Sequence, residues 1–319
     1  MNFLKNRNLV LGLMLLIAAS LYAVYVYQQD SSSLNDRDIA FAVEDTAAVD
    51  RMVLIRFLLE EEQEELQFSR TEAGWLLNER YPAFQPNVNS LLGTLSQLHV
   101  QEVLIEKGLD AGKELLEQQR LRLEVYDGRK KVKEILIGRE GKDAQGTLMM
   151  LASSSRPFIV GIPGFSGYLN SRFTMDMDFW REKLLFQAKP DQLAAISISY
   201  QNDPINQLSL KKEGEDWTLA DATGNADAIQ MYLSQFKGKV YAEAFVSDRY
   251  PEAMGELANE QPDIIFELTY QDGSERSVIL FEQADNPNAY LGWVKGEEDL
   301  MSIQHFVFDK YLVKREELL

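Results

Sequence analysis

The residue types that most often carry out chemistry in proteins are scarce in this sequence. It contains no cysteine and only two histidines, His99 and His305. A chain without cysteine cannot form a disulfide scaffold, a zinc ribbon or an iron–sulfur cluster, and it has no thiol nucleophile. Two distant histidines do not form a histidine-rich metal site. We therefore predict no catalytic, metal-binding or cofactor-binding residues, and no cofactor.

Two short motifs resemble parts of known active sites, but both are incomplete. Residues 164–167 (GFSG) resemble the nucleophile elbow of hydrolases, which requires a glycine two residues after the serine, and Tyr168 occupies that position. Residues 234–237 (SQFK) match the Ser-x-x-Lys of penicillin-binding enzymes without either of its partner motifs. The first motif is typical of a glycine-rich turn and the second arises from composition. We therefore predict that the protein is not an enzyme.

Carboxylates are the most abundant candidate groups. A run of acids at residues 60–65 could bind a divalent cation, although such a run at a hairpin tip is more often a solvated turn. The 50 acidic residues could also supply the carboxylate pair of a glycoside hydrolase, but no pair is singled out. With 32 basic residues the formal net charge is −18. We predict no binding to nucleic acid, because phosphate recognition requires a basic field.

The N-terminal region predicts a membrane anchor. Residues 9–27 contain no charged residue and would form a helix about 28 Å long, close to the thickness of a bilayer's hydrocarbon core. Lys5 and Arg7 precede this run, so the positive-inside rule places residues 1–27 as a cytoplasmic stub and single-pass anchor, with the bulk of the chain outside. A cleaved signal peptide, cut near residues 18–20, is the alternative. Residues 28–37 are polar and are expected to form a linker.

The rest of the chain contains one pattern twice, at a spacing near 142 residues. Trp75 opens a short strand in the first copy and Trp217 does so in the second. An amphipathic helix follows each of them, with apolar residues at positions i, i+3, i+4 and i+7 from Val88 and from Ile229. A strand, a short helix and a hairpin come next in both copies. This order predicts an α+β fold of two tandem repeats, each a mostly antiparallel sheet packed with an amphipathic helix.

The ends of the repeats are predicted from a second match. Residues 181–185 (REKLL) resemble residues 315–319 (REELL) at a spacing of 134, which implies an insertion around residues 172–178 of the first copy. The repeats are therefore expected to span residues 38–186 and 187–319. Trp75 and Trp217 are expected to anchor strand to helix in the two cores, since large aromatic residues at repeated positions usually serve burial.

One apolar segment is a candidate docking site for a partner. Phe158, Ile159, Val160, Ile162 and Phe165 lie close together and are punctuated by glycines. Exposed apolar loops of this kind mark interfaces, so these five residues are the candidate partner-docking residues. A buried strand that enters a tight turn is the interpretation that the pattern favours over docking.

The exported body resembles the bacterial family named domain of unknown function 4340. The resemblance rests on the predicted transmembrane helix, on residues 41–45 (FAVED) and 49–51 (VDR), on Gly74-Trp75 and Trp180-Arg181, and on Trp217. It covers residues 38–319. Members of this family commonly sit beside genes for ABC-2-type transporters of the gliding-motility kind. The resemblance therefore implies an accessory role, with an ABC transporter permease and its associated subunits as partners, at the bacterial inner membrane. It assigns no catalytic residue.

These observations lead to one favoured hypothesis and two alternatives. The favoured one is a membrane-anchored, extracytoplasmic and non-catalytic accessory subunit of an ABC-type transport complex, with most of the chain in the periplasm. The first alternative is a cell-envelope ligand-binding module with a cleft between the two repeats. The second is an envelope hydrolase that uses a carboxylate pair, which sequence alone does not reveal.

Overall fold

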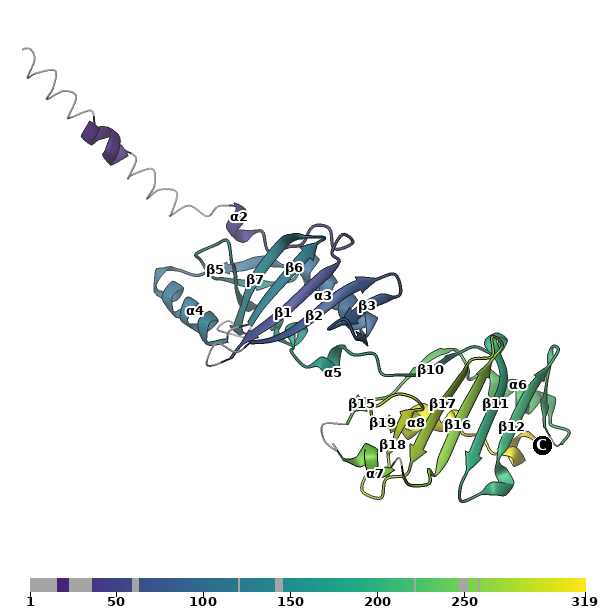
Figure 1. The fold of residues 1–319 in the computed structure, drawn as a ribbon. Helices are drawn as coiled ribbons and strands as arrows, with labels where there is room; N and C mark the ends of the chain where they lie inside the picture. Colours follow the sequence, from purple (N-terminus) through teal and green to yellow (C-terminus); the bar gives the residue numbers. More distant parts are fainter. Residues whose placement is uncertain are drawn as a thin grey trace, which may run out of the picture. The chain divides into compact units, whose positions relative to one another are not determined.

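The computed structural model describes residues 16–22, 36–58, 63–119, 121–140, 146–220, 222–246, 252–257 and 259–319. The chain divides into two compact units. The second unit consists of Tyr81–Gln85 and Asp176–Leu319, and the first unit is the remainder of the chain up to Met175. Both units combine antiparallel strands with helices (Figure 1). The prediction of a mixed α+β fold is confirmed at this level.

The first unit contains a sheet with helices on both of its faces. Its elements are α2 (Asp36–Ile39), β1 (Arg51–Phe57), β2 (Gln63–Thr71), β3 (Gly74–Leu77), α3 (Gln85–Gln97), β5 (His99–Val103), α4 (Glu106–Gln119), β6 (Leu121–Asp127), β7 (Lys130–Glu140), β8 (Thr147–Leu151), β9 (Phe158–Gly161) and η3 (Asn170–Phe173). The two-residue strand β4 (Tyr81–Pro82) lies between β3 and α3 in the chain and falls in the segment that belongs to the second unit. From β3 onward the strand order is β3-β2-β1-β6-β7-β8-β9-β5, and every neighbouring pair is antiparallel.

The second unit has an eight-stranded sheet and a separate strand pair, β10 with β14. Its elements are α5 (Met177–Trp180), β10 (Leu184–Ala188), η4 (Pro190–Gln192), β11 (Leu193–Tyr200), η5 (Pro204–Asn206), β12 (Leu208–Glu213), β13 (Asp216–Leu219), α6 (Ala226–Leu233), β14 (Gly238–Tyr241), β15 (Ala244–Phe245), α7 (Ala253–Leu257), β16 (Ile264–Tyr270), β17 (Glu275–Phe281), β18 (Ala289–Val294), β19 (Met301–Gln304), α8 (His305–Phe308), η6 (Asp309–Tyr311) and η7 (Arg315–Leu318). The order of its sheet is β13-β12-β11-β16-β17-β18-β19-β15.

The two sheets therefore have the same strand order. In chain order, β1, β2 and β3 correspond to β11, β12 and β13, and α3 corresponds to α6. After the helix, β5, α4 and β6 to β9 correspond to β15, α7 and β16 to β19. The repeated sequence pattern thus corresponds to one topology that occurs twice.

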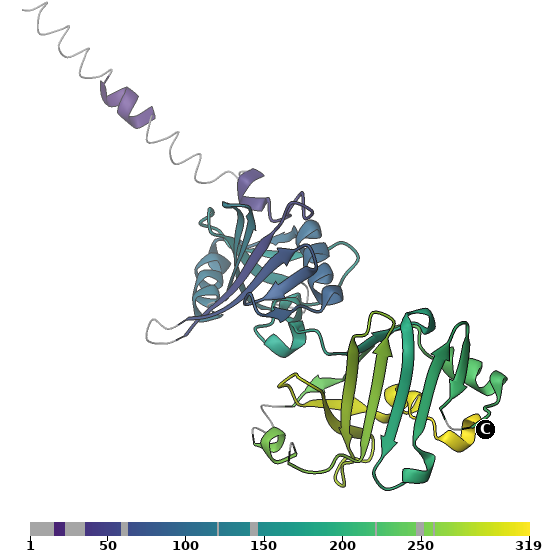
Figure 2. The same ribbon diagram turned by 45° about the vertical axis from the view of Figure 1, so that its right-hand side comes forward.

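The main core of each unit lies between the sheet and its amphipathic helix (Figure 2). Helix α3 buries Val88, Leu91 and Leu95, and α6 buries Ile229, Tyr232 and Leu233. The start of α6 is set by Asn225, whose side chain accepts hydrogen bonds from the N–H groups of the first turn, as N-cap residues do. The apolar spacing in the sequence therefore corresponds to the buried faces of both helices.

The two tryptophans occupy equivalent places in these cores. Trp75 is buried opposite Arg70 in the β2–β3 ladder, and Trp217 is buried opposite Lys212 in the β12–β13 ladder. Neither indole is exposed enough to serve as a stacking platform for a ligand. Their burial agrees with a role as core anchors.

The observed division between the units differs from the one expected between residues 186 and 187. Residues 184–188 form β10, which pairs with β14, so this segment belongs to the second unit, whose main part starts at Asp176. Residues 315–318, which resemble this region in sequence, form the 3-10 helix η7. The similarity of these two charged segments is therefore a similarity of composition, which does not specify secondary structure.

The predicted membrane anchor lies mostly outside the described residues. Of residues 9–27, only residues 16–22 are described, and they are helical. Within the part of the chain that the structure describes, no helix has the length and apolar character needed to cross a membrane.

Candidate functional site

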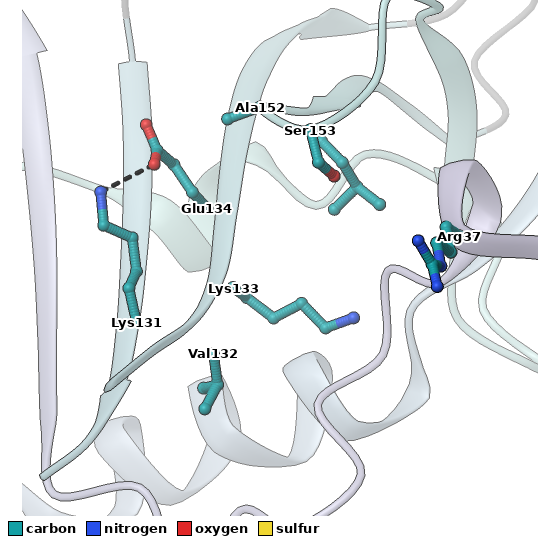
Figure 3. A pocket seen from close by; sticks show the side chains of 8 residues that line it. Arg37, Lys131, Val132, Lys133, Glu134, Ala152 and Ser153 are labelled. Carbon is teal, nitrogen blue, oxygen red and sulfur yellow. Dashed lines mark hydrogen bonds and ion pairs between the residues drawn. The ribbon is translucent and has the colours of Figure 1, made fainter. Parts of the chain in front are cut away.

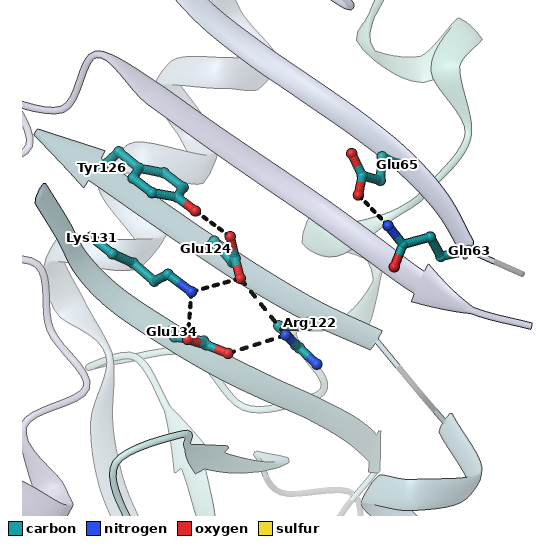
Figure 4. Close-up of polar contacts among 7 residues, drawn as sticks. All are labelled: Gln63, Glu65, Arg122, Glu124, Tyr126, Lys131 and Glu134. Atoms are coloured by element: carbon teal, nitrogen blue, oxygen red, sulfur yellow. Dashed lines mark hydrogen bonds and ion pairs between the residues drawn. The ribbon is translucent and has the colours of Figure 1, made fainter. Parts of the chain in front are cut away.

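A charged network occupies the second face of the first sheet. Along β6, Leu121, Leu123 and Val125 point into the main core, so the alternating residues Arg122, Glu124 and Tyr126 point to the opposite face. Helix α4 covers a neighbouring part of that face by packing Leu116 against Leu148 and Ile159. The rest of the face carries the outer network, which consists of Arg122, Glu124, Tyr126, Lys131 and Glu134 (Figure 4).

The outer network is a closed set of ion pairs. The Lys131 Nζ atom lies 2.8 Å from Glu124 Oε1 and 2.7 Å from Glu134 Oε2. The Arg122 Nη1 atom lies 3.7 Å and 3.3 Å from the same two carboxylates. The Tyr126 hydroxyl donates a hydrogen bond to Glu124. Two carboxylates thus share two cations, which balances the charges on this partly buried face.

The electrostatics of the outer network do not favour proton transfer. Burial raises the pKa of Glu124, but hydrogen bonds from Lys131 and Tyr126 and the charges of Lys131 and Arg122 outweigh it, so the pKa is lowered. The pKa of Lys131 is raised by its hydrogen bonds to the two carboxylates. A glycosidase requires one carboxyl with a raised pKa as the general acid. Glu124 does not meet that requirement, so the network is suited to bracing strands and presenting charge.

A β-bulge separates the two lysines of β7. The register shifts so that Tyr126 lies opposite Lys131 and Val125 lies opposite Lys133. Since a bulge adds one residue to one strand, side chains two positions apart no longer share a face. Lys131 reaches the outer network, whereas Lys133 donates to the carbonyl of Ala40 in the segment before β1. The bulge therefore directs the Lys131 ammonium to the network and leaves the Lys133 ammonium outside it, although both lysines line one pocket.

That pocket, named the basic pocket here, has a volume of about 380 Å³ (Figure 3). It is lined by Arg37, Lys131, Val132, Lys133, Glu134, Leu151, Ala152 and Ser153. Burial lowers the pKa of Lys133, and the charge of Glu44 opposes this effect. No carboxylate of the described residues lies within ion-pair distance of Lys133. Lys133 thus combines partial burial with incomplete neutralisation.

The predicted docking residues lie mainly in the core. Phe158, Ile159, Val160 and Ile162 are buried, and the first three belong to β9, which lies between β8 and β5. Only Phe165 is exposed, by 37%, in the loop that follows. The observed arrangement is the one that the sequence favours, a buried strand that enters a turn. A docking surface made of these five side chains is therefore not supported.

The exposed apolar residues are next to that segment, on the edge strand β5. It is the last strand of the described sheet, paired on one side with β9. Val103, the last residue of β5, is 41% exposed, and Ile105, two residues further on, is 77% exposed. Leu115 of α4 is exposed as well. Sequence reasoning identified this segment as a strand but missed its edge position, because strand order is not encoded in local periodicity.

The other sequence candidates do not form a site. In the described ranges no group of three or more His, Cys, Asp or Glu side chains could hold a metal ion. Of the acidic run, residues 60–62 lie outside the described residues, while Glu64 pairs with Arg56 and Glu65 accepts from Gln63. Residues 164–167 form a turn with positive φ at Gly164 and Gly167. Ser234 ends α6, with its hydroxyl donating to the Met231 carbonyl.

The two histidines are in different settings. His99 begins β5, and its ring is exposed. His305 begins α8 and stacks on Tyr290 at 4.0 Å between ring centroids. Asp309 accepts the Tyr290 hydroxyl at 2.9 Å and lies 3.4 Å from the His305 ring. Burial and this hydrogen bond raise the pKa of Tyr290, so the hydroxyl remains a donor that ties η6 to β18.

Comparison with protein-family models matches residues 75–257 to a family described as "Domain of unknown function (DUF4340)". The matched span begins at the tryptophan of β3 and ends with α7, so it includes parts of both units. No curated protein and no solved structure matches the chain.

Proposed function

Because this chain belongs to the DUF4340 family, whose model matches more than half of its length, we propose that it is an accessory subunit of an ABC-type transport complex. In this proposal it is a non-catalytic, membrane-anchored interaction protein. Residues 9–27 anchor it among the helices of the permease, and the two units lie in the periplasm. The genomic setting implied by the family resemblance and the uncharged N-terminal run support this role.

The observation that carries the proposal is the exposed edge of the first sheet. An edge strand presents unpaired backbone N–H and C=O groups, and soluble proteins usually shield such edges. Here β5 ends at the exposed Val103, and the side chain of Ile105, two residues further on, is also exposed. An edge with adjacent apolar side chains is suited to strand addition by a partner, in which backbone hydrogen bonds give affinity and side-chain pockets give specificity.

The closed outer network supports a binding role over a catalytic one. Its two carboxylates are held by the same two cations, and the pKa of Glu124 is lowered. A charged face of this kind can orient a partner and influence the rate of association. We therefore assign partner contact to the β5 edge of the first unit, with the charged face of β6 and β7 as a second contact region of the same unit.

The proposal is tested by crosslinking in intact cells, extraction of the tagged full-length protein in mild detergent, and mass spectrometry of the co-purified proteins. We expect to recover a permease and an ATPase. The variant Ile105→Lys should lose the permease, because it places a charge on the docking edge. The matched control is Ile205→Lys, since Ile205 is 82% exposed in η5 of the second unit.

Each result has a separate meaning. Recovery of the wild-type protein alone would contradict the accessory role. Recovery of the same partners with Ile105→Lys as with the wild type would leave that role intact and would refute the β5 edge as the contact. Loss of partners with Ile205→Lys alone would move the contact to the second unit.

A further inference from the structure

The basic pocket has the composition of an anion site. The formal net charge of the chain is −18, so its overall field repels anions, and an anion can bind only where cations are concentrated locally. Arg37, Lys131 and Lys133 all line the basic pocket, against one carboxylate, Glu134. Figure 3 shows the Lys133 side chain extending toward Arg37, on the other side of the strand from the Lys131–Glu134 ion pair.

The one carboxylate in the basic pocket is already neutralised. Glu134 accepts from Lys131 at 2.7 Å and lies 3.3 Å from Arg122. Lys131 is in turn shared with Glu124 at 2.8 Å. These charges cancel within the outer network. Among the described residues Lys133 has no carboxylate at ion-pair distance, and only the more distant charge of Glu44 acts on it.

The Lys133 ammonium can donate more hydrogen bonds than it makes to the described residues. It carries three N–H donors, and within the described residues it donates to the Ala40 carbonyl. Its partial burial makes the positive charge costly, as the lowered pKa reflects. A bound anion would offset this cost through a charge-assisted hydrogen bond. The nearby Ser153 hydroxyl lines the same pocket and can donate to the same anion.

The remaining wall is apolar and defines the rest of the ligand. Val132, Leu151 and Ala152 line the basic pocket. A neighbouring pocket of about 470 Å³ shares Val132 and Lys133 but is also lined by Glu44, Asp45 and Asp127, so it disfavours anions. We infer that the basic pocket binds a small organic anion, with its carboxylate or phosphate group on Lys133 and Ser153 and its apolar part against Val132 and Leu151.

This inference is independent of the transporter proposal. It places ligand binding inside the first unit, in contrast to the cleft between the repeats that the sequence suggested. It also gives the bulge of β7 a role, because the bulge directs Lys131 to the ion pairs of the outer network and leaves the Lys133 ammonium of the same pocket outside those ion pairs.

Isothermal titration of the full-length protein in detergent tests the inference with four probes: phenyl phosphate, benzoate, phenol and inorganic phosphate. We expect phenyl phosphate or benzoate to bind and phenol not to bind, because phenol lacks the anionic group. Inorganic phosphate should bind more weakly than phenyl phosphate, because it lacks the apolar part. Equal affinity for these two phosphates would refute the role of Val132 and Leu151.

Variants assign the binding to Lys133. Lys133→Met should weaken binding about tenfold or more, because it removes one charge-assisted hydrogen bond to the anion. Lys133→Arg keeps the charge and the donors, so it should retain binding. Ser153→Ala, at an exposed position that leaves folding intact, should weaken binding a few-fold. Lys211→Met removes one exposed charge from the second unit and should bind as the wild type does. Absence of binding to both organic anions, or full binding by a folded Lys133→Met variant, would overturn the inference.

Discussion

The two units have one strand order but different second faces. In β6 and β16, inward apolar residues alternate with outward ones, and Glu124 and Glu267 occupy equivalent outward positions. Glu124 lies opposite Glu134 and is neutralised by Lys131 and Arg122. Glu267 lies opposite Ser277 and accepts from the hydroxyls of Ser277 at 3.1 Å and Ser197 at 3.4 Å. The scaffold is thus preserved while the chemistry of its second face is not.

The edge strands of the two sheets also differ between the units. The edge strand β5 has five residues and exposed apolar neighbours, whereas its counterpart β15 has two residues. The second unit instead has a dense aromatic core in which Phe186, Phe236, Phe266, Phe308 and Tyr311 contact one another. The described parts of the two units therefore differ in two features: the first has the longer edge strand with exposed apolar residues, and the second has this aromatic cluster.

The largest effect is expected from removing the equivalent tryptophans. Trp75→Ala and Trp217→Ala should each destabilise their own unit by about 3–5 kcal/mol, because each leaves a large cavity in a core. Trp75→Ala should cost more, since the Arg70 guanidinium lies 4.9 Å from the Trp75 ring centroid. Chemical denaturation, combined with hydrogen exchange followed separately in each unit, measures the free energy of unfolding of the two units. Simultaneous destabilisation of both units by either variant would show that they do not unfold separately.

A second large effect is expected from one glycine of the second unit. A Cβ atom at Gly292 in β18 would lie 2.4 Å from the backbone oxygen of Ile279, so Gly292→Ala requires a backbone shift. We expect a loss of about 1–3 kcal/mol, the usual cost of overpacking. Gly255→Ala in α7 is the matched control, because nothing lies within 4 Å of the added Cβ.

That control should be neutral or stabilising, since alanine favours a helix over glycine by about 1 kcal/mol. The thermal midpoint of the second unit measures both variants. A Gly292→Ala protein as stable as the wild type would show that β17 and β18 can separate freely, and the close packing of this sheet would then be wrong.

The sequence predicted the elements better than their arrangement. Alternation in the strands and the i, i+3, i+4 stripes from Val88 and Ile229 are local signals, and both helices bury the expected faces. The outer network escaped prediction because the pairing of Glu124 with Glu134 depends on strand register and on a bulge. Docking at the Phe158 segment stayed open as a candidate for a related reason: an apolar run looks the same in a central strand and at an exposed surface.

A smaller effect should distinguish the equivalent glutamates. Glu124→Gln removes a charge that two cations share, so we expect a loss of about 1–3 kcal/mol from the first unit. Glu267→Gln removes only an acceptor of two serine hydroxyls, so we expect a loss of about 0.5–1 kcal/mol from the second unit. Urea denaturation of both variants measures the difference. Equal losses would mean that the ion pairs add nothing beyond hydrogen bonding.

The stability of the first unit should depend on pH through Glu124, with little change near neutrality and a growing loss of stability in acid. The pKa of Glu124 is lower in the folded protein than its ordinary value, so the ionised carboxylate stabilises the fold above that ordinary value. This contribution is lost as the pH falls below about 4.5 and through the lower folded pKa. The stability of the first unit should therefore decline over this window in the wild type and decline less in Glu124→Gln. Lys131→Met should also flatten the decline, because Lys131 supplies the hydrogen bond and charge that lower the pKa of Glu124. Denaturation curves recorded from pH 7 to pH 3 measure the slopes, and a wild-type slope that neither variant changes would assign the acid sensitivity of this unit to carboxylates outside the outer network.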